Sequence, residues 1–337
     1  MIGWNEILDS PINNSAVIHV WTSREKLLEA ISLGHRAILS RGFYLDHMAS
    51  TDFHYQQEMH ADFELRNNRW KLLLGGEACL WTEYIDHRMV QSRLWPRTAA
   101  IAERFWSRSI DTIECLYDRL DLIHQRFFDP GDEQYIKDLS TLDSDVTAIR
   151  LLADFCEPLG LDGRNRQLNY NKDTPLNRFV DFLRPESNRT RKLIETNNVT
   201  VLHSVFLSWI NIKNQLKTNH PEIIQLAENV AQLGEFGLSL LNTLSTIPDK
   251  RIVSSRWYYY HMRQLDLLEK NVPEIRLAAV RILRSLLVQC DPCSFDIINL
   301  SLLLIFPLAV LFVRKVTYIR RRLLIPCLNC CFSLCKL

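Results

Sequence analysis

Aromatic and acidic side chains recur just after short apolar runs in the first part of the chain. Indole rings can stack on the apolar face of a pyranose, and carboxylates accept hydrogen bonds from pairs of sugar hydroxyls. These residue types therefore indicate a sugar site, but tryptophans are also common core residues, and the residue types alone leave both interpretations open. The residues concerned are Trp4, Trp21, Tyr44, Asp46, Trp81 and Glu83.

The apolar runs before these residues are short and alternate with segments of helical spacing. Ala16–Trp21 and Arg36–Ser40 are two such runs, and Ser23–Ser32 between them has apolar residues at helical spacing. Near-continuous apolar strands that alternate with helices predict parallel βα units, whose active-site loops follow the strands. Arg93–Trp106 is then expected to form one long amphipathic helix.

Helical periodicity continues over residues 110–290, with an interruption by Pro and Gly at Cys156–Gly163. The 40 basic and 39 acidic residues give a net charge of +1, which argues against a nucleic-acid-binding protein. The chain has no Gly-x-Ser-x-Gly elbow, phosphate loop or Gly-x-Gly-x-x-Gly motif, and no cofactor is predicted. His19, in an apolar run, is expected to be a core residue with its hydrogen bonds satisfied.

The end of the chain has a different composition. Ile297–Val313 contains 17 residues without a charge and is followed by a basic cluster, which makes it a candidate membrane span. A buried core helix and a tail from a shifted reading frame are the alternatives. Cys290 and Cys293 have the spacing of a zinc ribbon, as do Cys327 and Cys330, but the apolar segment lies between the two pairs, so no metal site is predicted.

The start of the chain has neither the basic region nor the apolar region of a secretory signal. The sequence therefore predicts no signal peptide and leaves the localisation open. The nine cysteines, most of them close to the C-terminus, do not have the distribution of a disulfide framework.

Five segments occur in an order that resembles one enzyme family. They are Gly3–Glu6 (GWNE), Val20–Trp21 (VW), Phe43–Asp46 (FYLD), Gly75–Tyr84 (GGEACLWTEY) and Ser92–Arg97 (SRLWPR). Together they are similar to the C-terminal half of the catalytic barrel of glycoside hydrolase family 20, the β-N-acetylhexosaminidases.

The resemblance implies an α/β fold with about the last four βα units of a (β/α)8 TIM barrel, followed by an all-helical C-terminal region. The expected boundaries are residues 1–128 for the partial barrel and 129–164 for a linker. A helical extension over 165–290 and an apolar, Cys-rich tail over 291–337 complete the chain.

The resemblance also implies a role for each candidate residue. The three tryptophans at positions 4, 21 and 81 resemble the aromatic walls around the terminal sugar. Tyr44 resembles the phenol that orients the acetamido group, which is itself the nucleophile in this family. Asp46 and Glu83 resemble the acids that hold the 4- and 6-hydroxyls of the sugar. The expected partner is a glycan that contains N-acetylhexosamine.

One part of the family pattern has no counterpart in this sequence. The family carries its orienting Asp and its general acid Glu as an adjacent pair on an earlier strand. The one Asp-Glu pair here, Asp132-Glu133, follows a Pro-Gly turn and is expected to lie in a solvated loop. The expected function is therefore a hexosaminidase that is truncated before its acid. The alternatives are an inactive barrel fragment that retains sugar binding, a product of a broken gene, and a membrane-tethered helical protein with a vestigial barrel.

Overall fold

The computed structural model describes residues 1–59, 69–107, 109–127, 133–167, 173–196, 198–246, 254–270 and 273–290. The chain separates into two units. The first comprises residues 1–246 and 263–286, and the second comprises residues 247–262 and 287–337. All of the residues discussed below as site residues belong to the first unit.

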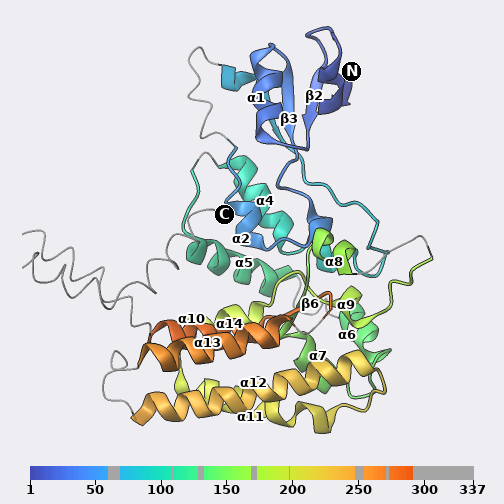
Figure 1. Ribbon diagram of the computed structural model, residues 1–337. Coiled ribbons are helices and arrows are strands. Elements are labelled where there is room, and N and C mark those ends of the chain that lie inside the picture. Colours follow the sequence, from blue (N-terminus) through green and yellow to red (C-terminus); the bar gives the residue numbers. More distant parts are fainter. Residues whose placement is uncertain are drawn as a thin grey trace, which may run out of the picture. The chain divides into compact units, whose positions relative to one another are not determined.

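A parallel sheet forms the N-terminal part of the first unit, and each strand lies next to the one that follows it in sequence (Figure 1). Trp4 lies opposite His19, and His19 lies opposite Ile38, so neighbouring strands end close together. The α/β class with a parallel sheet is thus confirmed. The strands are β1 (Ile2–Trp4), β2 (Val17–Val20), β3 (Arg36–Leu39) and β4 (Leu73–Gly76).

Helix α1 (Arg24–Ser32) connects β2 to β3. It begins after Ser23, whose hydroxyl accepts a hydrogen bond from the backbone N–H of Lys26 at 3.3 Å and so caps the first turn. Leu27 and Ile31 are buried in a cluster with apolar residues of β2 and β3. Their helical spacing is therefore what places the helix against the sheet.

The single long helix expected over residues 93–106 is not present. The structure has two helices there, α3 (Val90–Leu94) and α4 (Arg97–Trp106). Pro96 lies between them, and a proline inside a helix has no N–H to donate and clashes with the preceding turn. α4 nonetheless buries Ile101 against the sheet residues, as its amphipathic pattern predicts.

Short helices carry the chain through the segments that follow the strands. Two helices, α2 and α5, pack near α4, and Tyr55 of α2 is buried with Leu116 of α5. The elements are the 3₁₀ helices η1 (Asn5–Asp9), η2 (Leu45–His47) and η3 (Arg69–Leu72), with the α-helices α2 (Thr51–Tyr55) and α5 (Ile113–Phe127).

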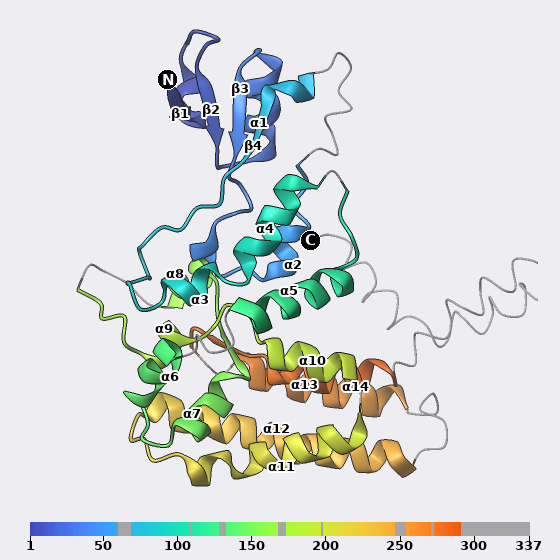
Figure 2. The same ribbon diagram turned by 180° about the vertical axis from the view of Figure 1, so that it is seen from behind.

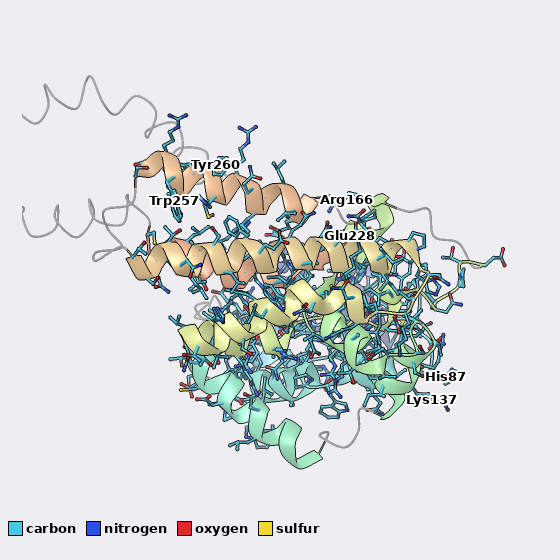
Figure 3. The ribbon with its side chains drawn as sticks, turned by 90° about the horizontal axis from the view of Figure 1, so that it is seen from below. His87, Lys137, Arg166, Glu228, Trp257 and Tyr260 are labelled. Atoms are coloured by element: carbon cyan, nitrogen blue, oxygen red, sulfur yellow. The ribbon has the colours of Figure 1, made fainter. Side chains whose placement is uncertain are left out.

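The rest of the described chain is mostly helical, as expected. The two longest helices, α11 and α12, lie side by side (Figures 1 and 2). Lys213 of α11 forms an ion pair with Glu228 of α12, which is labelled in Figure 3. The helices are α6 (Glu133–Ser140), α7 (Val146–Ala153), α8 (Leu161–Gln167), α9 (Phe179–Phe182), α10 (Asn188–Thr196), α11 (Val199–Gln215), α12 (Pro221–Thr246), α13 (Ser255–Lys270) and α14 (Ala279–Val288).

The expectation of an all-helical C-terminal region is not met in full. β5 (Cys156–Pro158) and β6 (Ile275–Leu277) form a two-stranded antiparallel sheet. The buried Glu157 of β5 accepts hydrogen bonds from the side chain of Arg276 and from the backbone of Ser187. The segment 129–164, proposed from sequence as a linker, holds α6, α7, β5 and the start of α8.

Within the part of the chain that the structure describes, no helix combines the length and the apolar character that crossing a membrane requires. The candidate span at residues 297–313 lies outside the described residues, as do Asp132 and the tail over 291–337.

Candidate functional site

All the sequence-predicted site residues lie at or just beyond the carboxyl ends of the four strands. One tryptophan ends β1, a second directly follows β2, and the others lie in the segments after β3 and β4. In parallel βα folds, ligands bind at this edge of the sheet. The residues are Trp4 at the end of β1, Trp21 after β2, Tyr44 and Asp46 after β3, and Trp81 and Glu83 after β4.

The three tryptophans present their rings to solvent. The exposed fractions of Trp4, Trp21 and Trp81 are 40%, 42% and 47%. The rings of Trp4 and Trp81 lie 6.2 Å apart between centroids, at an interplanar angle of 44°. These three residues are therefore not core residues, and two of them form adjoining apolar surfaces at the same edge of the sheet.

Neighbouring polar residues fix the second tryptophan in place. The side-chain oxygen of Asn5 accepts a hydrogen bond from the backbone N–H of Trp21 at 3.0 Å, and the indole N–H of Trp21 donates to Glu6 at 2.8 Å. Asn5 is itself buried. Sequence reasoning assigned no role to Asn5 or Glu6, although both belong to the GWNE segment.

Asp46 ties the segment after β3 to the segment after β4. Its carboxylate accepts a hydrogen bond from the backbone N–H of Trp81 at 3.1 Å, and the residue is 5% exposed. Burial raises the pKa of Asp46, the nearby charge of Glu83 raises it as well, and the Trp81 hydrogen bond and the neighbouring His47 oppose the shift. Glu83 is exposed, so the two acids differ in environment.

Tyr44 is buried, and its ring stacks on that of His47, with 5.0 Å between the ring centroids. Burial raises the pKa of its phenol, whereas hydrogen bonds with the side chains of Ser40 and Trp81 lower it. The phenol is therefore protonated at neutral pH and can donate a hydrogen bond. Sequence reasoning did not single out His47, because nothing in its type or spacing showed that it would stack on Tyr44.

Backbone pairing beyond the strand ends positions these side chains. Tyr44 and Cys79 form an isolated parallel bridge, in which the N–H of Leu45 donates to the carbonyl of Cys79 at 2.8 Å. The buried guanidinium of Arg97 then donates to the carbonyls of Leu45 at 2.8 Å and Ala49 at 2.9 Å. Arg97 therefore anchors the loop that carries Asp46.

A cavity of about 620 Å³ lies beside this site. His47 lines it from η2, and the remaining lining residues belong to the start of the helical region, including Asp162 and Arg166. Arg166 is labelled in Figure 3, and its guanidinium donates to the carbonyl of Asp162 at 3.1 Å. The helical region thus reaches the edge of the sheet where the candidate residues gather.

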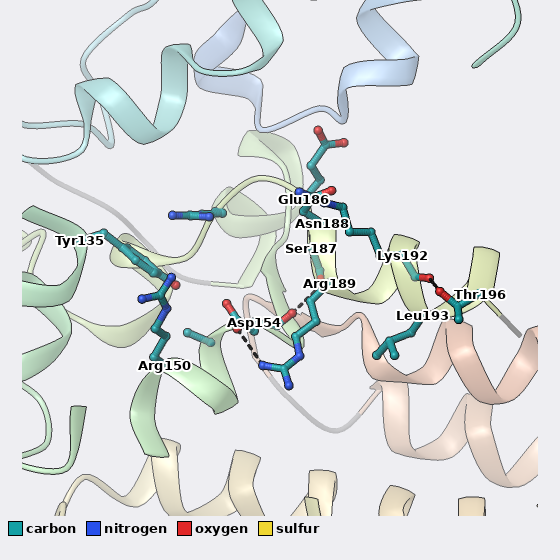
Figure 4. Close-up of a pocket in the computed structure, with 12 residues that line it drawn as sticks. Tyr135, Arg150, Asp154, Glu186, Ser187, Asn188, Arg189, Lys192, Leu193 and Thr196 are labelled. Carbon is teal, nitrogen blue, oxygen red and sulfur yellow. Dashed lines mark hydrogen bonds and ion pairs between the residues drawn. The ribbon is translucent and has the colours of Figure 1, made fainter. Parts of the chain in front are cut away.

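A second cavity, of about 310 Å³, lies among the helices (Figure 4). Several of its polar groups pair with one another. Arg189 contacts Asp154 at 3.3 Å, and the guanidinium of Arg184 lies over the ring of Tyr135 at 4.7 Å. Burial raises the pKa of Asp154. This cavity does not have the paired indole surfaces found at the strand ends.

Comparison with known proteins agrees with the family resemblance found in the N-terminal part of the sequence. Residues 1–109 match the catalytic domain of glycosyl hydrolase family 20. Among similar proteins, β-hexosaminidase subunit beta of Rattus norvegicus is 36% identical over 138 residues, which are 39% of this chain and 26% of that protein. The corresponding subunit of Homo sapiens is 33% identical over 138 residues, with 39% and 25% covered. Subunit alpha of Bos taurus is 35% identical over 129 residues, with 35% and 24% covered.

A solved structure extends the similarity of the fold. The chitobiase of Flavobacterium johnsoniae superimposes with a TM-score of 0.73 over 85% of this chain and 47% of that chain, at 24% sequence identity. The chain spans about a quarter of the length of the curated relatives it matches. Over residues 1–109, the chain is therefore a homologue of part of the catalytic domain of family 20 β-hexosaminidases.

Proposed function

We propose that residues 1–109 supply the sugar-binding side of a β-N-acetylhexosaminidase site, on about the last four βα units of a (β/α)8 barrel. The substrate is a glycan with a terminal non-reducing N-acetylhexosamine. The reaction is hydrolysis with retention of configuration at the anomeric carbon, in which the acetamido oxygen of the substrate is the nucleophile. The domain boundaries expected from sequence, with the partial barrel over 1–128 and the helical extension over 165–290, belong to this proposal.

The observation that carries the proposal is the juxtaposition of the Trp4 and Trp81 rings, together with the hydrogen bond that joins Trp81 to Asp46. Two exposed indoles 6.2 Å apart offer apolar faces to a pyranose ring. Asp46 lies at the same place because its Oδ1 atom accepts the N–H of Trp81, and its Oδ2 atom, 3.8 Å from Nε2 of His47, is the oxygen we assign to a sugar hydroxyl. An apolar wall beside a positioned carboxylate is the combination that a sugar ring with polar edges requires.

Tyr44 supplies the group that acts on the acetamido oxygen. Its phenol is protonated at neutral pH, because burial raises its pKa. A hydrogen bond from this phenol orients the acetamido group toward the anomeric carbon, and it gains strength as charge redistributes in the transition state. Asp46 and Glu83 hold the hydroxyls on the opposite side of the ring, and Trp21 completes the wall with the other indoles.

Hydrolysis also needs a general acid, which contributes about 10²–10⁴-fold to the rate. In the family pattern this acid belongs to an Asp-Glu pair on an earlier strand. The acids assigned above, Asp46 and Glu83, hold hydroxyls instead. A second candidate function is therefore sugar binding without turnover, and Asp46 favours it because its hydrogen bond to Trp81 fits a holding role better than proton transfer.

The experiment is a titration of the 337-residue chain with N-acetylglucosamine, followed by tryptophan fluorescence. We expect saturable binding, and we expect Trp81→Ala to weaken it roughly tenfold because a stacking surface is lost. The matched control is Trp106→Ala, since Trp106 ends α4 with 91% of its surface exposed. Absence of binding, or equal weakening in both variants, would refute the proposal.

Turnover separates the two candidate functions. With an aryl N-acetyl-β-glucosaminide we expect the chain by itself to bind the compound and hydrolyse it negligibly. Rapid hydrolysis by protein free of contaminating glycosidase would show that an acid within these 337 residues serves the reaction, and would favour the enzyme over the binding fragment.

A further inference from the structure

We propose that His19, Glu77 and Cys79 form a binding site for a borderline-soft divalent cation, with Zn²⁺ as the best match. One ring nitrogen of His19, a carboxylate oxygen of Glu77 and the Sγ atom of Cys79 all lie within 4.8 Å of one another. The inference does not rest on the proposed function, because metal binding can be measured without any sugar.

Regular backbone pairing holds all three residues. His19 belongs to β2 and lies opposite Trp4 on β1 and Ile38 on β3. The N–H of Glu77 donates to Leu39 of β3 at 2.9 Å, and the N–H of Cys79 donates to the carbonyl of Phe43 at 3.0 Å. The donors are therefore presented by paired backbone that is fixed before any metal arrives, which lowers the cost of assembling the site.

The chemistry of the three donors selects the metal. Imidazole, thiolate and carboxylate are the side chains that bind Zn²⁺, and three protein ligands with one open position are a common zinc arrangement. In such a site the ligand atoms are about 3.3–3.7 Å apart, as follows from metal–ligand distances of about 2.0–2.3 Å in a tetrahedron. The ligand atoms must therefore come closer together when an ion binds, and the exposed side chain of Glu77 can make most of this movement. The exposure of Glu77 also gives the ion a way in.

His19 provides a second, independent observation. The residue is 7% exposed, and its Nε2 atom is buried without a hydrogen-bond partner. The sequence-based expectation is therefore correct that His19 is buried but wrong that its hydrogen bonds are satisfied. A buried polar atom that lacks a partner destabilises the fold, whereas an imidazole nitrogen without a partner is free to bind a metal.

A bound ion would have structural consequences that are specific to this place. It would join β2 to the segment after β4, across the intervening β3. It would also fix the imidazole on which the ring of Trp4 stacks, with 4.3 Å between centroids. Because the thiolate is the ligand form of cysteine, Cys79 would release its thiol proton to solvent on binding.

The test uses Co²⁺ as a spectroscopic substitute for Zn²⁺ on the full chain, which is first stripped of metal. Thiolate-to-Co²⁺ charge transfer and intense visible bands report a tetrahedral site with a cysteine ligand. The cysteines beyond residue 290 can add a signal of their own, so each variant is compared with the parent by difference. The variants are His19→Gln, Glu77→Gln and Cys79→Ser, and the control is Cys115→Ser, which removes an exposed cysteine elsewhere.

We expect the parent to bind one more equivalent of Co²⁺ than His19→Gln or Cys79→Ser does. The two variants should lose the corresponding charge-transfer absorbance. Glu77→Gln should weaken that equivalent at least tenfold, Cys115→Ser should leave it unchanged, and Zn²⁺ should displace it. Zn²⁺ should also raise the melting temperature of the parent more than that of His19→Gln. Equal Co²⁺ stoichiometry and spectra in the parent, His19→Gln and Glu77→Gln would overturn the proposal. Because Glu77 is exposed, its variant decides the matter even if the substitutions at His19 and Cys79 impair folding.

Discussion

At the scale of single residues, the candidate site contains polar groups whose burial lowers the stability of the fold. Asp46 is an acid that is 5% exposed, and Tyr44, two residues before it, is also buried. Holding a carboxylate in such a place costs free energy unless its partners compensate. Here one backbone N–H, that of Trp81, is the principal compensation. Functional sites often lower the stability of the fold in this way.

A change at Asp46 tests this trade. Burial raises the pKa of its carboxyl, so the folded chain holds the proton more tightly than the unfolded chain. The stability associated with the neutral acid is therefore complete at low pH and is lost as the pH rises through the folded pKa. Asp46→Asn, which can still accept the Trp81 N–H, should melt at a higher temperature than the parent at pH 7, and the difference should shrink toward pH 4.

The same variant should bind N-acetylglucosamine roughly tenfold more weakly, since a charge-assisted hydrogen bond is lost. Thermal melts at the two pH values and the fluorescence titration provide the measurements. Asp9→Asn, at an exposed position, is the control and should change neither by much. An Asp46→Asn variant that is less stable than the parent at pH 7 would contradict the assignment of the pKa shift to burial.

At the scale of elements, the loop that carries Asp46 depends on α4. The Arg97 guanidinium, 1% exposed, donates to backbone carbonyls of Leu45, Ala49 and Arg93. Burial lowers its pKa to about 10, so it remains charged at neutral pH. Arg97→Met should lower the free energy of unfolding by about 3 kcal/mol, because buried carbonyls lose their donors. Urea denaturation measures this free energy, and Arg36→Met, at an exposed position of β3, is the control. Equal losses in the two variants would argue against an anchoring role.

The contact between α11 and α12 gives a prediction whose sign is informative. In an exposed helix, replacement of glycine by alanine stabilises by about 1 kcal/mol. At Gly234, however, an added Cβ would lie 2.7 Å from the backbone oxygen of Phe206. Gly234→Ala should therefore lower the melting temperature, whereas Ser239→Ala at an exposed position of α12 should change it little. A stabilised Gly234→Ala variant would mean that the two helices are not packed this closely.

Sequence patterns predicted some of these elements and not others, for physical reasons. The parallel strands were predictable because β2 is apolar except for His19 and is followed by a helix that Ser23 caps. Pro96 was visible in the sequence, yet the amphipathic pattern around it continued and concealed the break. β5 and β6 have three residues each and pair across more than a hundred positions, so their local sequence contains too little information to reveal them.

The site shows the same limit. Residue types and the family resemblance indicated which tryptophans, acids and tyrosine to examine, and the structure places them at one edge of the sheet. The cluster of His19, Glu77 and Cys79 could not be predicted in this way, because its members lie on β2 and after β4. Only the folded sheet brings them within reach of one another.

At the scale of the whole chain, the helical region is joined to the sheet-containing region by buried polar contacts. Arg93, fully buried, donates to the carbonyls of Leu183 at 2.7 Å and Asp181 at 2.6 Å. Glu186 accepts the backbone N–H of Thr51 at 3.0 Å and the hydroxyl of Tyr117 at 3.0 Å. Burial raises the pKa of Glu186, so this acid is held at a cost that its partners offset. Contacts of this kind couple two regions more strongly than exposed ion pairs do.

The coupling predicts that residues 1–128 do not fold by themselves. Without the helical region, the guanidinium of Arg93 would lose both of its carbonyl partners, and Thr51 and Tyr117 would lose Glu186. Breaking buried charged contacts of this type costs about 3–5 kcal/mol each, which is comparable to the whole stability of many domains. A chain that ends at residue 128 should therefore lack the near-ultraviolet circular dichroism of packed aromatic residues and should not bind N-acetylglucosamine, whereas the full chain should unfold these regions in one transition. Addition of a separately produced 129–337 segment should restore part of the circular dichroism signal, because it supplies the buried contacts that the shorter chain lacks. A fragment that folds and binds the sugar as the full chain does would show that the helical region is an independent appendage.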